Sequence, residues 1–412
     1  MQNKSSDASY SRLITLPTSF TDEFVLNIAE LNRQFEKDGR KVYELYGSFQ
    51  NGIFHSARPA KYLPLISRSA FKQHVKLALE HGIRFNYLLN GTSYANAEYT
   101  HGGRTELEEL LQFLCDCGVS SVTVTAPYII DIIKSRFPDL EVLVSTIGYV
   151  GAKRGITQYE EIGANRIVLD VEVNRDFKFL RRVMPKSKVD LEIVVNPVCL
   201  YQCHFKFNHY CTATFGSRTH KDGCGHPYNQ YYLNWCYLEK LKSPGEFMRS
   251  PWVRPEDLPL YEELGMRHFK IAGRGLDSDE LVRRAKFYLQ GEFTGNLLAL
   301  LGWPHWLQFS KTAEGELLDP LEISLANEDL NGFLDFFQRE EPDCRLGCEG
   351  CGHCDKWAAK YIKNNDPKLL VGYIENMKVN IRSLVTAIPT AENSIKDQER
   401  WNNAAASQRL AE

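Results

Sequence analysis

The stretch YEEIGANRIVLDVEV, residues 159–173, joins a helical pattern to a strand pattern through one glycine. The same phrase recurs as LALEHGIRFNYLLN (77–90), LLQFLCDCGVSSVTVTAP (110–127) and YEELGMRHFKIAGR (261–274). In each copy the glycine, at position 82, 118, 163 or 265, stands where the end of a helix requires a left-handed residue. The strands are almost continuously apolar, as expected where both faces of a parallel sheet are buried.

Eight apolar runs of strand length occur in the first three-quarters of the chain. They are KVYELYG (41–47), RFNYLLN (84–90), SVTVTAP (121–127), EVLVSTIG (141–148), RIVLDVEV (166–173), DLEIVVN (190–196), EFMRSPWV (246–253) and HFKIAGR (268–274). Eight parallel strands alternating with helices predict an α/β fold, the (β/α)8 barrel of TIM type. A doubly wound open sheet is the alternative, because the count depends on the weak seventh run.

The same pattern divides the chain into four parts. We expect an N-terminal segment (1–40), a barrel domain (41–330), a C-terminal metal-binding extension (331–392) and a flexible tail (393–412). Within the barrel domain, residues 197–250 form a cysteine-rich loop after the sixth strand. Active sites of such barrels lie at the C-terminal ends of the strands, so this loop is expected at the functional face.

Charge and hydropathy narrow the possible partners and the compartment. The chain has 49 basic and 52 acidic residues, a formal net charge of -3, so no global field favours nucleic acid. A small molecule or a peptide is therefore the expected substrate. The N-terminus is polar, and no stretch reaches the roughly 18 apolar residues that span a bilayer. These features predict a cytoplasmic protein without a membrane span.

Nine of the eleven cysteines fall into two dense groups. The first comprises Cys199, Cys203, Cys211, Cys224 and Cys236; the second comprises Cys344, Cys348, Cys351 and Cys354. Thiols this dense, in a chain with no secretory signal, predict metal ligands rather than disulfides. Soft sulfur donors select zinc or iron–sulfur clusters.

The second group has the spacing C-x3-C-x2-C-x2-C. Zinc knuckles usually consist of two C-x2-C pairs with a longer spacer, so this near-continuous run favours a 4Fe–4S cluster, while a zinc ion held by all four cysteines stays open. We expect His353, inside the run, to lie beside the ligands rather than among them.

The first group is spaced irregularly, which suits a 4Fe–4S cluster under a long loop at the barrel mouth better than a zinc finger. The alternative to a catalytic role is that the cluster only holds this loop in place. Four protein ligands suffice, and Cys211 is set aside because it follows the aromatic run HFKFNHY (204–210), although Cys211 or Cys236 could supply the fourth thiolate.

The candidate catalytic side chains lie at the strand ends and in the loop. Lys270 and Arg274 follow the last strand and would hold an anionic substrate or oxygen donor, because arginine presents paired donors to a carboxylate. A salt bridge to Asp170 or Glu172 is the alternative for both. Glu172 and His209 complete the candidate set, since a histidine near a metal can act as acid or base.

Two motifs between residues 190 and 274 resemble the collagenase-like peptidases, peptidase family U32. LEIVVNPVCLYQCHFKFNHYC (191–211) with KDGCGHP (221–227) resembles that family's cysteine-bearing loop, and RPEDLPLYEELGMRHFKIAGR (254–274) resembles its ending. The likeness extends loosely over residues 41–290. Some members of the family are described as collagen-degrading proteases. Others are iron–sulfur proteins that hydroxylate ubiquinone precursors or RNA bases without oxygen.

The resemblance implies the ligand set and the reaction class. In the hydroxylases four cysteines bind a 4Fe–4S cluster at the barrel, and Cys199, Cys203, Cys224 and Cys236 match that role by position. The 344–354 knuckle is absent from the family pattern. We therefore expect an iron–sulfur oxidoreductase that performs oxygen-independent hydroxylation and needs an electron donor. The resemblance also allows a heterodimeric partner.

Three other functions compete with this expectation. A peptidase is the alternative from the family name, although the chain has neither an HExxH nor a GxSxG motif. A radical-SAM enzyme is disfavoured because no cysteines follow the first predicted strand. A non-catalytic iron–sulfur scaffold or sensor is the third alternative.

Overall fold

The computed structural model describes residues 10–50, 52–217, 231–303, 318–348 and 350–386. Its centre is a closed barrel of eight parallel strands. The strands are β1 (Arg12–Pro17), β2 (Arg40–Gly47), β3 (Arg84–Leu89), β4 (Ser121–Val124), β5 (Glu141–Val144), β6 (Arg166–Val168), β7 (Asp190–Val194) and β8 (His268–Lys270). The predicted (β/α)8 barrel is confirmed, and the open sheet is excluded.

The first strand was missed by the sequence pattern. β1 pairs in parallel with both β2 and β8 and so closes the barrel. The expected start of the barrel at residue 41 is therefore wrong, because residues 12–17 belong to it. A buried arginine hides the strand from a hydropathy pattern: Arg12 donates to Tyr288 O at 2.6 Å and pairs with Glu262 at 2.6 Å.

The seventh predicted strand, residues 246–253, is also wrong. This run forms helix α10 (Gly245–Arg249) followed by an irregular segment. Its apolar side chains fill the core instead of a sheet: Trp252 is fully buried, and its indole N–H donates to Phe247 O at 2.8 Å. One missed and one false strand cancel in the count, so the cysteine-rich loop follows the seventh strand of the barrel.

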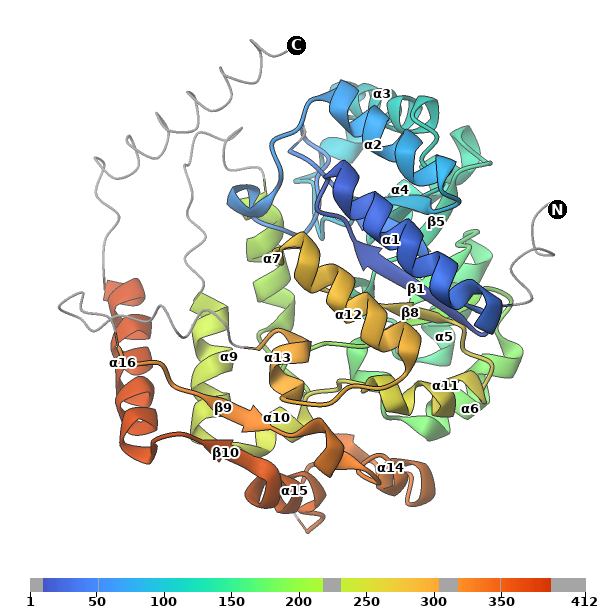
Figure 1. The fold of residues 1–412 in the computed structure, drawn as a ribbon. Helices are drawn as coiled ribbons and strands as arrows, with labels where there is room; N and C mark the ends of the chain where they lie inside the picture. The colour runs from blue at the N-terminus through green and yellow to red at the C-terminus, as the bar shows by residue number, and fades with distance from the viewer. Residues whose placement is uncertain (1–9, 51, 218–230, 304–317, 349, 387–412) are drawn as a thin grey trace.

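Helices cover the outside of the barrel (Figure 1). They are α1 (Asp22–Phe35), α2 (Arg68–Glu80), α3 (His101–Asp116), α4 (Pro127–Arg136), α5 (Lys153–Glu161), α6 (Phe177–Val183), α11 (Leu258–Glu262) and α12 (Ser278–Gln290). Where helices end before β3, β4, β6 and β8, the predicted glycines have φ values of 71°, 82°, 89° and 90°. This confirms the left-handed helix ends that the repeated phrase predicts.

The cysteine-rich loop contributes α7 (Lys206–Gly216) and α9 (Tyr231–Lys242). The later chain adds α13 (Leu297–Leu301), β9 (Ile323–Leu325), α14 (Asp335–Arg339), α15 (His353–Tyr361), β10 (Ile362–Asn364) and α16 (Pro367–Thr386). Figure 1 shows this orange-to-red part along the bottom of the view, with α16 beside α9 and α15 near α10. It packs directly on the barrel, because Phe337, Tyr373 and Met377 join the main hydrophobic core. The expected tail, 393–412, lies outside the described residues.

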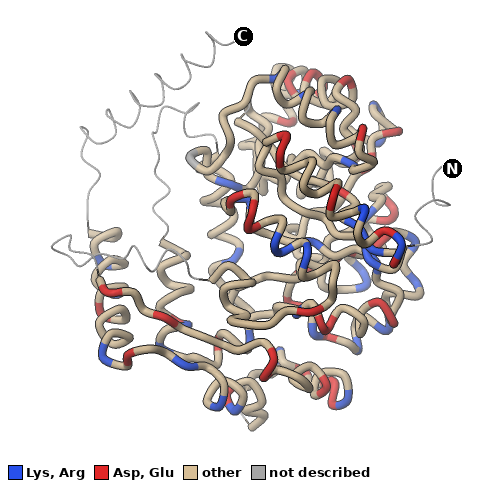
Figure 2. Tube along the Cα trace, viewed as in Figure 1, with Lys and Arg blue, Asp and Glu red and all other residues tan. Residues whose placement is uncertain are grey.

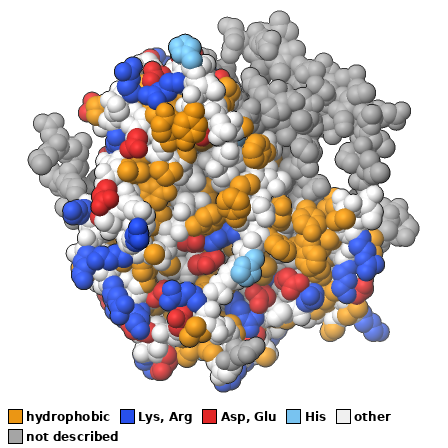
Figure 3. Space-filling view, turned by 180° about the vertical axis from the view of Figure 1, so that it is seen from behind, with side chains coloured by type: hydrophobic (Ala, Val, Ile, Leu, Met, Phe, Trp, Pro, Cys, Tyr) orange, Lys and Arg blue, Asp and Glu red, His pale blue; other side chains and the backbone are white. Residues whose placement is uncertain are grey.

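Charge is mixed over the molecule. Figure 2 shows acidic and basic residues interspersed along the chain, and Figure 3 shows charged side chains of both signs among apolar ones on the rear face. Over the described ranges, no helix is both long and apolar enough to cross a membrane.

Candidate functional site

A buried polar layer fills the barrel below its mouth. Glu44 on β2 is fully buried and accepts two hydrogen bonds from Arg166 Nη2 on β6, at 3.0 and 3.1 Å. It also accepts from Ser121 Oγ at 2.8 Å and from Asn86 Nδ2 at 3.0 Å. Burial is the largest single effect on the pKa of Glu44, and it raises that pKa. The Arg166 and Arg84 guanidinium groups and the hydrogen bonds from Asn86 and Ser121 together outweigh burial, so the pKa of Glu44 is lowered. The barrel interior is therefore a fixed charge network.

Lys270 stands at the end of β8, above this layer. Its side chain is 8 % exposed, and its Nζ lies 4.2 Å from the centre of the Tyr46 ring. Among the described residues, Lys270 Nζ has no hydrogen-bond partner. Burial lowers the pKa of Lys270, while the Glu192 and Glu44 carboxylates oppose that effect. Such an amine is available to a ligand that enters the mouth.

Arg274 lies beside Lys270 at the same end of the barrel. Its Nη1 donates to Ser56 Oγ at 3.3 Å. With Arg58 it lines a cavity of about 380 Å³, which also contains the hydroxyl-bearing Thr18, Ser19 and Ser48. Guanidinium and hydroxyl groups are donors, so this cavity suits an anionic group.

The alternative role considered for Lys270 and Arg274, a salt bridge to Asp170 or Glu172, is not found among the described residues. Those carboxylates pair instead with Lys206 on α7. Lys206 Nζ lies 3.0 Å from both Asp170 oxygens and 2.6 Å from Glu172 Oε1. Glu172 is therefore part of the attachment of α7 to the rim, which leaves its carboxylate less available for proton transfer.

Three thiols of the first cysteine group, those of Cys199, Cys203 and Cys236, influence one another electrostatically. Burial, with smaller contributions from the neighbouring thiols of Cys236 and Cys203, raises the pKa of Cys199 to about 12. Burial also raises the pKa of Cys236, with Cys203 again a neighbour. Lys240, on α9, is within electrostatic range of all three thiols. Cys224 lies outside the described residues.

Cys211 and His209 lie on α7 near this group. Thr92 Oγ1 donates to Cys211 Sγ at 3.5 Å. This contact is compatible with either role for Cys211, so the choice between Cys211 and Cys236 as the fourth ligand stays open. The His209 ring stacks on Tyr232 with centroids 5.7 Å apart, and burial lowers its pKa to about 4. His209 is therefore neutral near pH 7.

The second cysteine group forms its own site beside the barrel. Cys344, Cys348, Cys351 and Cys354 all line one cavity of about 220 Å³. Arg249, from α10, donates from Nε to Cys348 Sγ at 3.2 Å. His353 lines the same cavity, and its ring stacks on that of Phe336 with centroids 4.1 Å apart.

Both thiol groups have the chemistry of metal ligands but are spread out. In the described ranges, no three His, Cys, Asp or Glu side chains are arranged to hold one metal ion. Raised thiol pKa values mean that binding a metal must release protons. The donor set of three mutually interacting thiols with a neighbouring cation fits a sulfur-ligated cluster.

Comparison with known proteins places the chain in a family. The model of peptidase family U32 matches residues 58–291, more than half of the chain. The chain belongs to peptidase family U32. The match runs from the segment after β2 to the end of α12, so it includes Lys270, Arg274 and the whole cysteine-rich loop. The 344–354 knuckle lies outside it.

One curated protein and one solved structure are similar to this chain. The uncharacterized protease MJ1657 of Methanocaldococcus jannaschii is 27% identical over 337 residues, which cover 82% of this chain and 92% of that protein. The solved structure of the U32 peptidase Mk0906 aligns with a TM-score of 0.46 and 19% identity, over 65% of this chain and 94% of that chain. The names of the U32 family and of the Methanocaldococcus jannaschii protein indicate an enzyme.

Several residues of this U32 site escaped the sequence pattern. Lys206 pairs with Glu172, Tyr210 hydrogen-bonds the Cys199 side chain, and Lys240 interacts electrostatically with the thiols. No local motif marks them. The partners of Lys206 lie 34 and 36 residues away in the sequence, so only the closed barrel brings them together.

Proposed function

We propose that this U32 protein is an iron–sulfur enzyme that hydroxylates a small molecule or peptide without oxygen, or performs a related redox modification. The observation that carries the proposal is the concentration of five cysteines, Cys199 to Cys236, in the loop after β7, where Cys199 interacts electrostatically with Cys203 and Cys236. In this proposal Cys224 supplies the fourth thiolate of a 4Fe–4S cluster. The bound cluster would supply one-electron chemistry at the barrel mouth.

The chain's own residues would bind and orient the substrate. Lys270 and Arg274 present two cationic groups at the end of β8, next to a cavity of about 380 Å³. They would hold an anionic group of the substrate or oxygen donor. Tyr210 interacts with both Arg274 and Cys199, so it connects this anion site to the thiols. Inserting an oxygen atom into a C–H bond removes two electrons from the substrate, and in this proposal the oxygen donor takes them up. An external electron donor, and in that role a protein partner, would only set the oxidation state of the cluster.

A peptidase is the second candidate, because the family and the archaeal relative carry that name. Peptide hydrolysis does not require an iron–sulfur cluster, so the dependence of activity on iron distinguishes the two functions. A peptidase would cleave peptides after complete removal of iron. The proposed hydroxylase would lose all activity under the same treatment.

The test is metal and sulfide content, with a visible spectrum, on protein purified without oxygen. Cys199→Ala should remove about four irons and four sulfides per chain, the content of one cube. Cys211→Ala is the matched control, since this thiol lies on the same loop and contacts Thr92; it should retain the iron. Zinc without sulfide in the parent protein would refute the proposal.

A further inference from the structure

We propose that the C-terminal knuckle is a second 4Fe–4S centre and that arginines of the barrel complete it. All four knuckle thiols surround one cavity of about 220 Å³. The near-continuous C-x3-C-x2-C-x2-C spacing of these thiols favours a cube over a zinc ion, whose ligands usually come as two separated C-x2-C pairs. A cube binds each thiolate at a different iron, so it needs thiols around a space of this kind.

The backbone of the knuckle curls around this cavity. Gly350 and Gly352, on either side of Cys351, have φ values of 83° and 60°. Left-handed residues at these two positions turn the chain sharply, and glycine adopts them without strain. Cys351 is the exposed member of the four, while Cys344, Cys348 and Cys354 are half-buried. The loop therefore brings thiols from two directions to the same space.

The only histidine of the knuckle is committed to packing. His353 stacks between Phe336 at 4.1 Å and Phe333 at 5.1 Å. Its Nε2 lies 3.2 Å from Phe333 O. The ligand set is therefore the four cysteines, which suits a cube.

Two arginines of the barrel face the thiols. Arg249 donates to Cys348 Sγ at 3.2 Å and also pairs with Asp355 on α15. Arg175 is buried, donates to Met248 O at 2.5 Å and to Trp252 O at 3.0 Å, and interacts electrostatically with Cys354 and Cys344. A thiolate-bound cluster is anionic, so adjacent cations stabilise it and raise its reduction potential.

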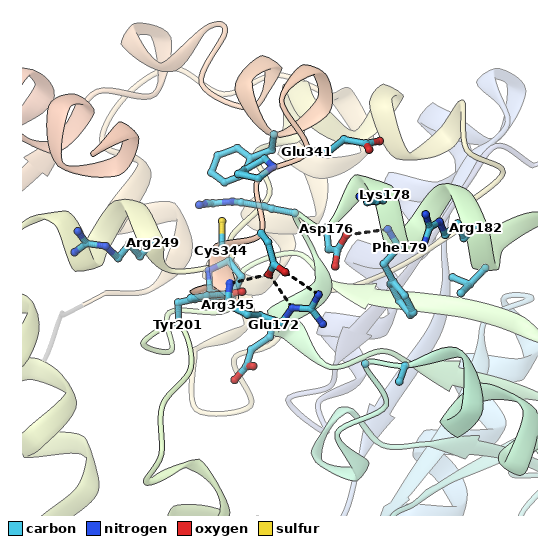
Figure 4. Close-up of a pocket in the computed structure, with 18 of the residues that line it drawn as sticks. Glu172, Asp176, Lys178, Phe179, Arg182, Tyr201, Arg249, Glu341, Cys344 and Arg345 are labelled. Carbon is cyan, nitrogen blue, oxygen red and sulfur yellow. Dashed lines mark hydrogen bonds and ion pairs between the residues drawn. The ribbon is translucent and has the colours of Figure 1, made fainter. Parts of the chain in front are cut away.

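The knuckle also faces the barrel mouth. Cys344, Cys348 and Cys354 line a larger cavity of about 540 Å³, whose other walls include Glu172 and Tyr201 (Figure 4). Tyr201 interacts electrostatically with Cys344, and in sequence it lies between Cys199 and Cys203. One tyrosine thus connects the two thiol groups. A relay of electrons from the knuckle to the mouth rests on the proposed function; the second cluster itself does not.

The first experiment counts iron and sulfide in anaerobic Cys351→Ser. Because Cys351 is exposed, the barrel should keep its fold, which far-UV circular dichroism and thermal unfolding verify. The variant should lose about four irons and four sulfides, one cube, while Cys115→Ser on α3 loses none. Unchanged iron, or the loss of one zinc instead, would overturn the proposal.

The second experiment measures the midpoint reduction potential of each cluster in a redox titration that is followed by electron paramagnetic resonance. Arg249→Gln should shift one midpoint to a more negative value, because a cation and an N–H···S bond are lost, and should leave the other unchanged. Arg249→Lys keeps the charge and should shift it less. Unchanged midpoints in both variants would contradict the role of Arg249. Cys199→Ala should remove the signal of the mouth cluster and leave the signal of the knuckle cluster. The two proposals can therefore fail independently: each is tested by its own signal.

Discussion

Lys206 on α7 and Glu172 beyond β6 form an ion pair of 2.6 Å at the barrel mouth, and the same amine lies 3.0 Å from both oxygens of Asp170. Two carboxylates of the rim thus share one cation from the cysteine-rich loop. These groups are mostly shielded from water, so the pair fixes where α7, His209 and Cys211 sit.

Replacing Lys206 by methionine should loosen α7. Two neighbouring carboxylates would lose their cation, and hydrogen bonds to charged groups are worth about 2 kcal/mol each. We expect lower stability to urea and faster proteolysis within 199–217. Lys242→Met, which removes an exposed pair with Glu239, is the control and should change the free energy of unfolding by less than about 1 kcal/mol. Equal effects in the two variants would contradict this role of Lys206.

The Glu44–Arg166 pair should behave as a buried ion pair. Its side chains are 0 % and 4 % exposed. Arg166→Met leaves the Glu44 carboxylate buried without its main cation, which should lower the free energy of unfolding by about 3–5 kcal/mol. Adding Glu44→Gln should recover part of that loss, because the buried charge is gone. Denaturant titration of the single and double variants measures the coupling energy between the two side chains. If the two changes in the free energy of unfolding simply add, the predicted coupling is wrong.

Gly245 packs closely against side chains at the knuckle. A Cβ at this position would lie 2.0 Å from Asp355 Oδ1 and 2.8 Å from Arg249 Nη1. Gly245→Ala should therefore break the Arg249–Asp355 contact and lower stability by about 1–2 kcal/mol, with increased hydrogen exchange in α15. Gly372→Ala is the matched control, since its Cβ would meet nothing within 4 Å on exposed α16 and should stabilise that helix. Unchanged exchange in Gly245→Ala would contradict the docking.

His74 should make the barrel sensitive to acid. It is buried beside Thr18, with its Nε2 2.8 Å from the hydroxyl, and burial lowers its pKa from 6.5 to about 4. The unfolded chain binds a proton near pH 6.5 while the folded chain does not, so stability falls as the pH drops from 6.5 to 4. The free energy of unfolding should fall by about 3 kcal/mol over this range.

Chemical unfolding of the parent protein and of His74→Leu across this pH range measures the effect. The variant should show a flatter dependence, whereas His81→Gln at an exposed position should follow the parent. Parallel curves for the parent and His74→Leu would show that other groups cause the acid sensitivity.

The sequence was sufficient for the barrel because its repeated unit is local. Each helix, left-handed glycine and apolar strand lies within about fifteen residues, and burial on both faces makes the strands uniformly apolar. The pattern failed where side chains depart from that rule. Arg12 hides β1 because its charge is satisfied by Glu262 and by the end of α12, which are distant in the sequence. The run 246–253 imitates a strand because Trp252 and its neighbours pack into the core.

The thiol groups could also be located from sequence, since the residue type itself carries the signal. Their surroundings could not. Arg249 reaches Cys348 across 99 residues, and Lys206 reaches Glu172 across 34. Such partners depend on how the barrel places its loops and on how the C-terminal segment folds back, which no local spacing encodes.

The pairing of β1 with β8 has a consequence for the order of events during synthesis. The ribosome makes residues 12–17 first and residues 268–270 more than 250 positions later, and the two must meet before the sheet is closed. Until then both strands present unpaired backbone edges, which need protection from association with other chains. The cysteines at 199–236 are synthesised before β8, so under the proposed function a cluster would have access to them while the mouth is still open.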